Sequence, residues 1–240
     1  MRRNLSLLAF AAGGLGLAGC GGGLPLAHPA HVLPSGKVTA GAGVDATIVA
    51  DPRVPLSAPN ARLQSIAVGP AVAPWIGARV GLGGGFEGGI GASSRAVRID
   101  GRRAFTFRER TLAFSVGAGV SAILASAPSG EASGVLGGGV DVPLLFGWRS
   151  SADLYAAWIG PRLRAQIFDG RVSDAAGPIP LEGRSVGVGG VAGLRAGLRH
   201  VFAVVEADVA YQWAWGTLGA EAVRLSGWTV TPFGGLVLSF

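Results

Sequence analysis

Charged residues are scarce in this chain. Of its 240 residues 14% are Asp, Glu, Lys or Arg and 49% are hydrophobic, which is too apolar for an ordinary soluble domain or for disorder. Beyond the amino-terminus the chain also lacks any run of about 18 uncharged apolar residues, so membrane-spanning helices are not expected. Its hydrophobicity is spread along short segments. Only strands closed into a barrel carry such segments across a bilayer with every backbone group paired.

Cysteine and histidine are equally rare. Cys20 is the single cysteine, so no intramolecular disulfide can form. His28 and His31 lie in a Gly- and Pro-rich stretch without carboxylates, which makes a poor ligand set, and His200 lies in a predicted turn. The sequence therefore predicts no metal site, no cofactor and no catalytic residues.

The amino-terminus has the parts of an export signal. Two arginines precede an apolar run from Leu5 to Leu17, and small residues follow it. The segment Leu17-Ala18-Gly19-Cys20 resembles the bacterial lipoprotein signal, which implies that residues 1–19 are removed and that Cys20 carries acyl chains. An ordinary signal peptide with an incidental cysteine is the alternative. Residues 20–36 are predicted to form the acylated cysteine and a flexible tether.

Apolar and polar residues alternate along most of the remaining chain. From Val38 to Ile48 every second residue is apolar, and the same period of two recurs over 112–124, 186–198 and 201–215. Each run is long enough to cross a bilayer as a tilted strand of about 9 to 11 residues. Residues 37–240 are therefore predicted to form an all-β, antiparallel up-and-down transmembrane β-barrel.

About ten strands are predicted. They cover 37–49, 73–83, 86–93, 95–107, 111–125, 135–148, 153–168, 185–199, 201–215 and 228–240. Fusing the third with the fourth would shift the count toward eight. Tight connections alternate with long ones at 50–72, 126–134, 169–184 and 216–227, which favours ten. An even count places both ends of the barrel in the periplasm.

Aromatic residues on the apolar parity fall into two groups, as in the girdles of membrane barrels. The predicted periplasmic girdle contains Phe105, Phe107, Phe146, Trp148 and Tyr155, and the outer girdle contains Tyr211, Trp213, Trp215 and Trp228. Trp75 and Trp158 have the opposite parity and should point inward. Four prolines inside strands, Pro74, Pro143, Pro161 and Pro232, are expected at bulges or strand ends.

Residues 37–240 resemble a small bacterial outer-membrane β-barrel. The last strand is similar to the insertion signal of that class at Leu236, Leu238 and Phe240, whereas Pro232 and Gly234 depart from it. The resemblance implies a location in the outer membrane, with the lipid on Cys20 on the periplasmic side. Its implied partners are outer-membrane lipid and the lipoprotein-processing and barrel-assembly machineries, and the protein is expected to be a monomer.

A lipid-anchored soluble β-sandwich is the competing fold, because its strands also alternate. Its polar parity would face water and should be rich in Lys, Glu and Thr. In this chain that parity consists mainly of Gly, Ala and Ser with scattered charges, as a narrow enclosed lumen requires. The basic residues form no compact patch with aromatics between them, so despite a net charge of +6 no nucleic acid is expected.

The inward parity carries the only functional clue. Predicted lumen-lining residues are Arg79, Arg95, Arg98, Asp100, Arg102, Asp141, Arg162, Arg164, Arg195, Glu206 and Asp208. Paired, they would simply fill the interior. We therefore expect a non-enzymatic barrel with a structural or surface-interaction role through its outer loops. A narrow, anion-favouring channel is the alternative. An outer-membrane hydrolase is a third hypothesis, whose only support is that some barrels of this fold are hydrolases.

Overall fold

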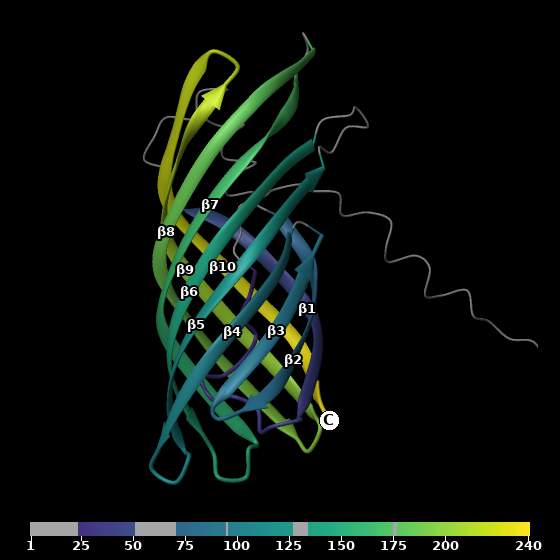
Figure 1. Cartoon of the computed structure of the whole chain (residues 1–240), viewed down its shortest axis with the longest axis vertical. Helices are drawn as coiled ribbons and strands as arrows, with labels where there is room; N and C mark the ends of the chain where they lie inside the picture. The colour runs from purple at the N-terminus through teal and green to yellow at the C-terminus, as the bar shows by residue number, and fades with distance from the viewer. Residues whose placement is uncertain (1–23, 51–70, 95, 127–133, 175–176) are drawn as a thin grey trace, which may run out of the picture.

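Ten antiparallel strands close into one barrel in the computed structural model, which describes residues 24–50, 71–94, 96–126, 134–174 and 177–240. The strands are β1 (Val38–Ala50), β2 (Ala71–Gly83), β3 (Phe86–Ser93), β4 (Ala96–Phe107), β5 (Leu112–Ser126), β6 (Gly134–Arg149), β7 (Tyr155–Asp174), β8 (Gly177–Leu198), β9 (Val201–Leu218) and β10 (Glu221–Ser239). Each strand pairs with its sequence neighbours, and β1 pairs with β10 to close the barrel (Figure 1). The predicted fold and the count of ten are confirmed, and the count of eight is wrong.

The two ends of the barrel differ. At the turn end, where β1 begins and β10 finishes, the connections are short: 84–85, 108–111, 150–154 and 199–200. The turn between β2 and β3 is made by Gly83, Gly84 and Gly85, whose φ angles of 85°, 60° and 82° lie in the left-handed region that favours glycine. We call the opposite end the loop end.

At the loop end the strands run further than the sequence indicated. Residues 169–184 and 216–227, expected as long loops, are mostly strand, since β7 continues to Asp174 and β8 starts at Gly177. Asp169, expected in a loop, lies opposite Glu182 in a regular ladder. β7 to β10 therefore rise above the other strands (Figure 1). The glycines and prolines of these segments are typical of loops, but antiparallel pairing of β7 with β8 and of β9 with β10 overrides them.

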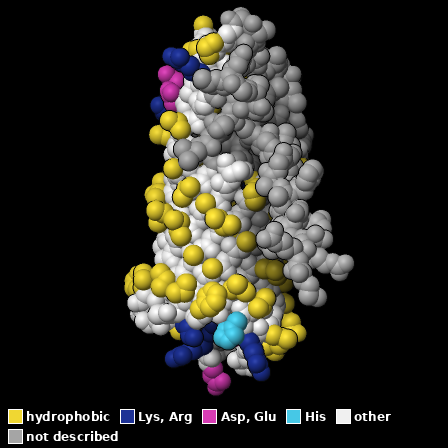
Figure 2. Space-filling view, turned by 90° about the vertical axis from the view of Figure 1, so that its right-hand side faces the viewer, with side chains coloured by type: hydrophobic (Ala, Val, Ile, Leu, Met, Phe, Trp, Pro, Cys, Tyr) yellow, Lys and Arg dark blue, Asp and Glu magenta, His cyan; other side chains and the backbone are white. Residues whose placement is uncertain are grey.

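The outer wall of the barrel is apolar. Large hydrophobic side chains such as Ile76, Ile90, Ile159 and Leu194 are more than half exposed, and Figure 2 shows hydrophobic side chains spread over the wall. A water-soluble domain does not expose a continuous apolar surface of this kind. Hydrocarbon is the solvent that matches it.

Aromatic side chains lie on the outer wall near both ends of the strands, as expected. Near the turn end Phe105, Phe107, Phe146, Trp148 and Tyr155 are exposed, and Phe114 stacks between Phe105 and Phe146. Near the loop end Trp213, Trp215 and Trp228 are exposed, and the Tyr211 ring packs edge-on against Trp213 and Trp228. Trp75 and Trp158 point inward and are buried.

Three of the four strand prolines lie beside gaps in the ladder, but without bulges. Pairing is interrupted next to Pro143 between β5 and β6, next to Pro161 between β6 and β7, and next to Pro232 between β1 and β10. The register is the same on both sides of each gap. Pro74 keeps its place opposite Val44. The one register shift in the described strands lies between β2 and β3, at Gly81 and Gly83. Because proline lacks only the donor, the neighbouring pairs hold the register.

Within the described residues, no helix has the length and apolar character needed to cross a membrane.

Candidate functional site

A segment ahead of the first strand occupies the lumen. We call Leu24–Pro34 the plug. Leu24, Leu26, His28, Ala30 and His31 are all buried, and the plug packs against inward-facing barrel residues that include Trp75, Trp158 and Phe233. At the turn end the chain reverses, with Gly36 N donating to Gly81 O at 2.9 Å, and enters β1. The sequence predicted a flexible tether here, and from Leu24 onward the structure differs from that expectation.

The composition of the plug explains why it fits a narrow polar lumen. Pro25, Pro29 and Pro34 have no N–H to satisfy and favour an extended chain. Leucines and alanines between them supply apolar contacts. A buried segment must pair its remaining backbone groups, and here luminal charges do so.

Four charged residues of the barrel wall hold the plug. Glu206 on β9 accepts from Leu26 N at 2.7 Å, from Ala27 N at 3.0 Å and from the Trp158 indole at 3.2 Å. Arg162 on β7 donates to Leu24 O at 2.9 Å. Nearer the turn end, Arg102 on β4 donates to Pro29 O and His31 O, and Glu87 on β3 accepts from Leu33 N at 2.7 Å. Charge-assisted bonds of this kind are about twice as strong as neutral ones.

The luminal charges also pair with one another in an unbroken series across the lumen, which involves residues of β2, β3, β4, β6, β7 and β9. In order, the series is Arg102–Glu87, Glu87–Arg79, Arg79–Asp100, Asp100–Arg98, Arg98–Asp141, Asp141–Arg162, Arg162–Asp208 and Asp208–Arg164. Arginine and carboxylate alternate along it, so most buried charges are compensated. Arg102, Glu87 and Arg162 belong to the series and also bind the plug.

The structure brings nearly all of the predicted lumen-lining residues together. The series contains Arg79, Arg98, Asp100, Arg102, Asp141, Arg162, Arg164 and Asp208 together with Glu87, and Glu206 of β9 binds the plug. Arg195 lies apart, at the turn end, where it pairs with Asp153 at 2.5 Å and stacks on Phe202. Arg95 lies outside the described residues, as does the proposed lipidation residue Cys20. Phe240 is exposed, and its backbone exchanges hydrogen bonds with Val38.

The residues that sequence reasoning missed are those of the plug. A signal was present, since Leu24, Leu26, Val32 and Leu33 make the segment far more apolar than a solvated linker. Gly and Pro in the same stretch masked it.

Toward the loop end the interior becomes apolar. A buried cluster includes Ile123, Phe168, Leu181, Leu218 and Val223, with Val49, Val172 and Ile179 packed against it. These side chains come from six strands and lie nearer the loop end than the charged series.

Both plug histidines are kept neutral by burial. Desolvation, aided by the nearby Arg102, Arg79 and Arg98 charges, lowers the pKa of His28 well below its usual value. Burial lowers the pKa of His31 to about 4, with the Arg149 charge acting in the same direction. His31 Nε2 donates to the Arg110 carbonyl at 3.1 Å, whereas its buried Nδ1 has no partner among the described residues.

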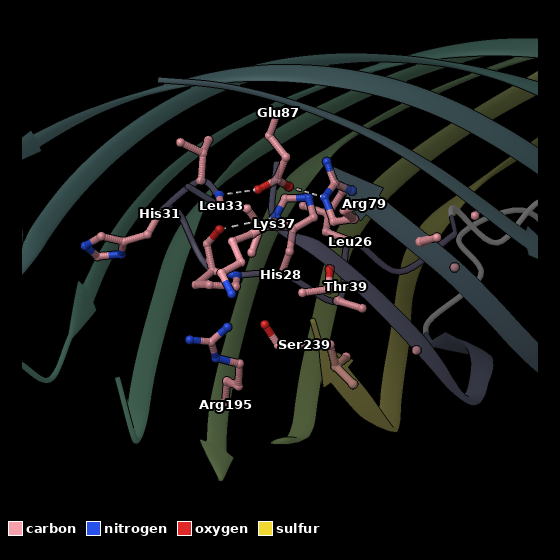
Figure 3. Close-up of a pocket in the computed structure, with 18 of the residues that line it drawn as sticks. Leu26, His28, His31, Leu33, Lys37, Thr39, Arg79, Glu87, Arg195 and Ser239 are labelled. Atoms are coloured by element: carbon pink, nitrogen blue, oxygen red, sulfur yellow. Dashed lines mark hydrogen bonds and ion pairs between the residues drawn. The ribbon is translucent and has the colours of Figure 1, made fainter. Parts of the chain in front are cut away.

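A cavity of 270 Å³ remains between the plug and the wall near the turn end (Figure 3). Its lining includes His28 and His31 of the plug, Lys37 and Thr39 at the start of β1, and Arg195 on β8. In the described part of the chain, no group of His, Cys, Asp and Glu side chains is arranged to hold a metal ion.

These features are those of an outer-membrane β-barrel: an even number of tilted antiparallel strands, an apolar outer band, aromatic girdles and short turns at one end. No protein-family model matches the chain, and the search of curated proteins finds no match.

Solved barrels are similar to this chain at low identity. Neisserial surface protein A is 12% identical, with 85% of this chain and 96% of that chain covered and a TM-score of 0.35. Ail, the attachment invasion locus protein of Yersinia pestis, is 10% identical over 86% and 99%, with a TM-score of 0.27. The translocator domain of the autotransporter NalP from Neisseria meningitidis is 12% identical over 88% and 90%, with a TM-score of 0.30. At this level of similarity the function must be argued from the residues of this chain.

Proposed function

We propose that this protein is a plugged, non-conducting outer-membrane barrel that presents its extended β7–β10 sheet to partners outside the cell. The observation that carries the proposal is the docking of Leu24–Pro34 in the lumen. The proposal includes no catalytic step, and hydrolysis of lipid or peptide by the purified protein would contradict it.

Passage through the lumen would require the plug to move. An ion entering from the turn end meets backbone bonded to Arg102 and Glu206, and beyond it the paired Asp141, Arg162 and Asp208. Arginines that already have carboxylate partners attract an anion less than free ones would. A static anion pathway, the alternative function, is therefore disfavoured by the same contacts that fill the barrel.

The extended strands offer the surface for interaction. Level with the girdle residue Trp215 and beyond it toward the loop end, the outer faces of β7 and β8 carry exposed charged residues, Asp169, Arg171, Glu182 and Arg184. This change from apolar to charged side chains marks where the hydrocarbon ends. Polar sheet raised above the bilayer is accessible to other macromolecules, and binding residues often lie on such projections.

The proposal places the barrel in the bacterial outer membrane, with the turn end in the periplasm and Cys20 acylated. Docking of the plug limits where an acylated Cys20 can lie. Leu24 is bonded to Arg162, seven residues into β7, which for a tilted strand lies about 18 Å from the turn end. The four residues back to Cys20 span at most about 14 Å. An acylated Cys20 in the periplasmic leaflet therefore requires Leu24 to leave Arg162.

Conductance in planar bilayers tests the proposal. Cys20→Ala barrels should be closed or open only briefly, whereas a variant that lacks residues 24–34 should conduct steadily. Steady conductance of the full-length Cys20→Ala barrel, suppressed by blocking near Arg162, would overturn the proposal of a plugged barrel. It would show that the protein is a channel.

A further inference from the structure

We propose that the cavity at the turn end is a binding site for a phosphate group. Among its lining residues are seven Lys or Arg side chains but only three carboxylates, Glu87, Asp100 and Asp153. The two deeper carboxylates are paired with arginines of the luminal series. The excess of positive charge therefore lies at the mouth of the cavity, where Lys37, Arg149, Arg195 and Arg199 surround a single carboxylate, that of Asp153.

Among the described residues, two of these four cations lack a carboxylate partner, and the other two share one. Within the described ranges no carboxylate pairs with Lys37 or Arg199. Asp153 serves two arginines, Arg195 at 2.5 Å and Arg149 at 3.7 Å, so it compensates neither fully. Figure 2 shows Lys and Arg side chains gathered with a histidine at this end of the barrel.

A buried donor also points to a ligand. Arg195 is 8% exposed and lines the cavity, yet its Nε has no hydrogen-bond partner in the described structure. Figure 3 shows its guanidinium directed toward the same space as the Ser239 hydroxyl, beneath His28 and Lys37. A buried, unpaired guanidinium donor costs free energy unless an acceptor is supplied.

Phosphate fits these donors best. A guanidinium, an ammonium and hydroxyls such as Thr39 and Ser239 can together satisfy three or more oxygens, and the excess of cations suits a dianion. The cavity is slightly smaller than the roughly 300 Å³ of the smallest typical ligand pockets, so the bound group is small. Because His28 and Leu26 form part of the lining, a bound phosphate would contact both plug and barrel.

Two sources could supply the phosphate, a soluble monoester or a lipid headgroup at the rim. Calorimetric titration of the Cys20→Ala barrel in neutral detergent with inorganic phosphate and with glycerol 3-phosphate, using glycerol as the uncharged control, tests the soluble source. Titration with nanodiscs tests the lipid source, comparing phosphatidylglycerol with phosphatidylcholine.

The exposed pair Lys37→Ala and Arg199→Ala should weaken binding by at least about tenfold, and Arg195→Gln should do the same. The matched control, Arg108→Gln, changes an exposed arginine at the same end that does not line the cavity, and it should bind normally. If the variants lose binding only in the lipid-free titration, the phosphate comes from a soluble monoester. If they lose binding only with nanodiscs, it comes from a lipid headgroup. Absence of binding in both formats, or equal binding by the Lys37/Arg199 variant and wild type, would overturn the site. Neither result depends on conductance, so the proposed function is tested separately.

Discussion

Removing the Glu206 carboxylate should release the plug. In Glu206→Ala the backbone donors Leu26 N and Ala27 N, at 2.7 and 3.0 Å from the carboxylate in the native protein, lose their acceptor inside the lumen. A buried donor without a partner costs about 1–3 kcal/mol, so docking should weaken by about 2–6 kcal/mol. Even the lower figure raises the released fraction by about 30-fold, since about 1.4 kcal/mol is a factor of ten.

Thiol accessibility measures this fraction. Ala30 is fully buried in the plug, so Ala30→Cys in a Cys20→Ala background should react with a bulky maleimide only after release. Adding Glu206→Ala should speed labelling by at least about 30-fold. Glu182→Ala, which removes an exposed carboxylate on β8, is the control and should label at the parent rate. A native-like gel mobility shift on heating verifies the barrel. Unchanged labelling of a folded Glu206→Ala barrel would refute the docking argument.

Three further predictions follow from the plug and the barrel seam. First, burial lowers the pKa of His31 to about 4 in the docked plug, and release of the plug returns it to about 6.5. Protonation of His31 therefore favours release, which is suppressed above pH 6.5 and grows as the pH falls toward 4. His31 should contribute about 30-fold to the rise in bilayer openings between pH 7.5 and pH 5, despite the opposing Asp153 charge. Because burial also lowers the pKa of His28, His28 adds to the rise, and His31→Asn should make the profile less steep by about that factor without abolishing it. An equally steep profile in that variant would exclude His31. Second, acylated Ala30→Cys protein, whose Cys20 is blocked by its lipid, should label faster than the Cys20→Ala form, and equal rates would contradict acyl anchoring in the periplasmic leaflet. Third, deleting Phe240 removes its two backbone bonds to Val38 at the β1–β10 seam and should lower the heat-modifiable fraction in outer membranes, whereas Phe240→Tyr should assemble; normal assembly of the deletion would show that the insertion signal lies elsewhere.

Much of the barrel could be predicted because a wall between lipid and lumen imposes a strict period of two. Along β5 and β9 this alternation correctly separates exposed residues such as Val120 and Val205 from buried ones such as Ser115 and Glu206. The same parity placed Trp75 and Trp158 inside. Strand ends at the loop end could not be predicted, because Gly177, Pro178 and Pro180 are held in β8 only by their pairing with β7.

The plug could not be predicted from local pattern. Its prolines prevent any regular period, and its burial depends on acceptors and donors that are distant in sequence. Leu26 is 180 residues from Glu206, and Leu24 is 138 residues from Arg162. The inward arginines and acids were identified one by one, but their order as a series follows from the register between strands. The cavity at the turn end is the space that remains between the plug and the barrel wall, so it could not be predicted without the plug.

A designed cross-link tests most directly whether residues 24–34 occupy the lumen. A Cβ built on Gly147 of β6 would lie 2.8 Å from the Ala30 Cβ, so with a small backbone adjustment a cysteine pair could reach the spacing of about 3.5–4.5 Å that a disulfide needs. In Cys20→Ala barrels, Ala30→Cys with Gly147→Cys should cross-link on mild oxidation, seen as a reducible mobility change. The control pair, Ala30→Cys with Gly101→Cys on the exposed face of β4, should not. If a folded barrel gave no more cross-link with Gly147→Cys than with Gly101→Cys, the plug would not occupy the lumen.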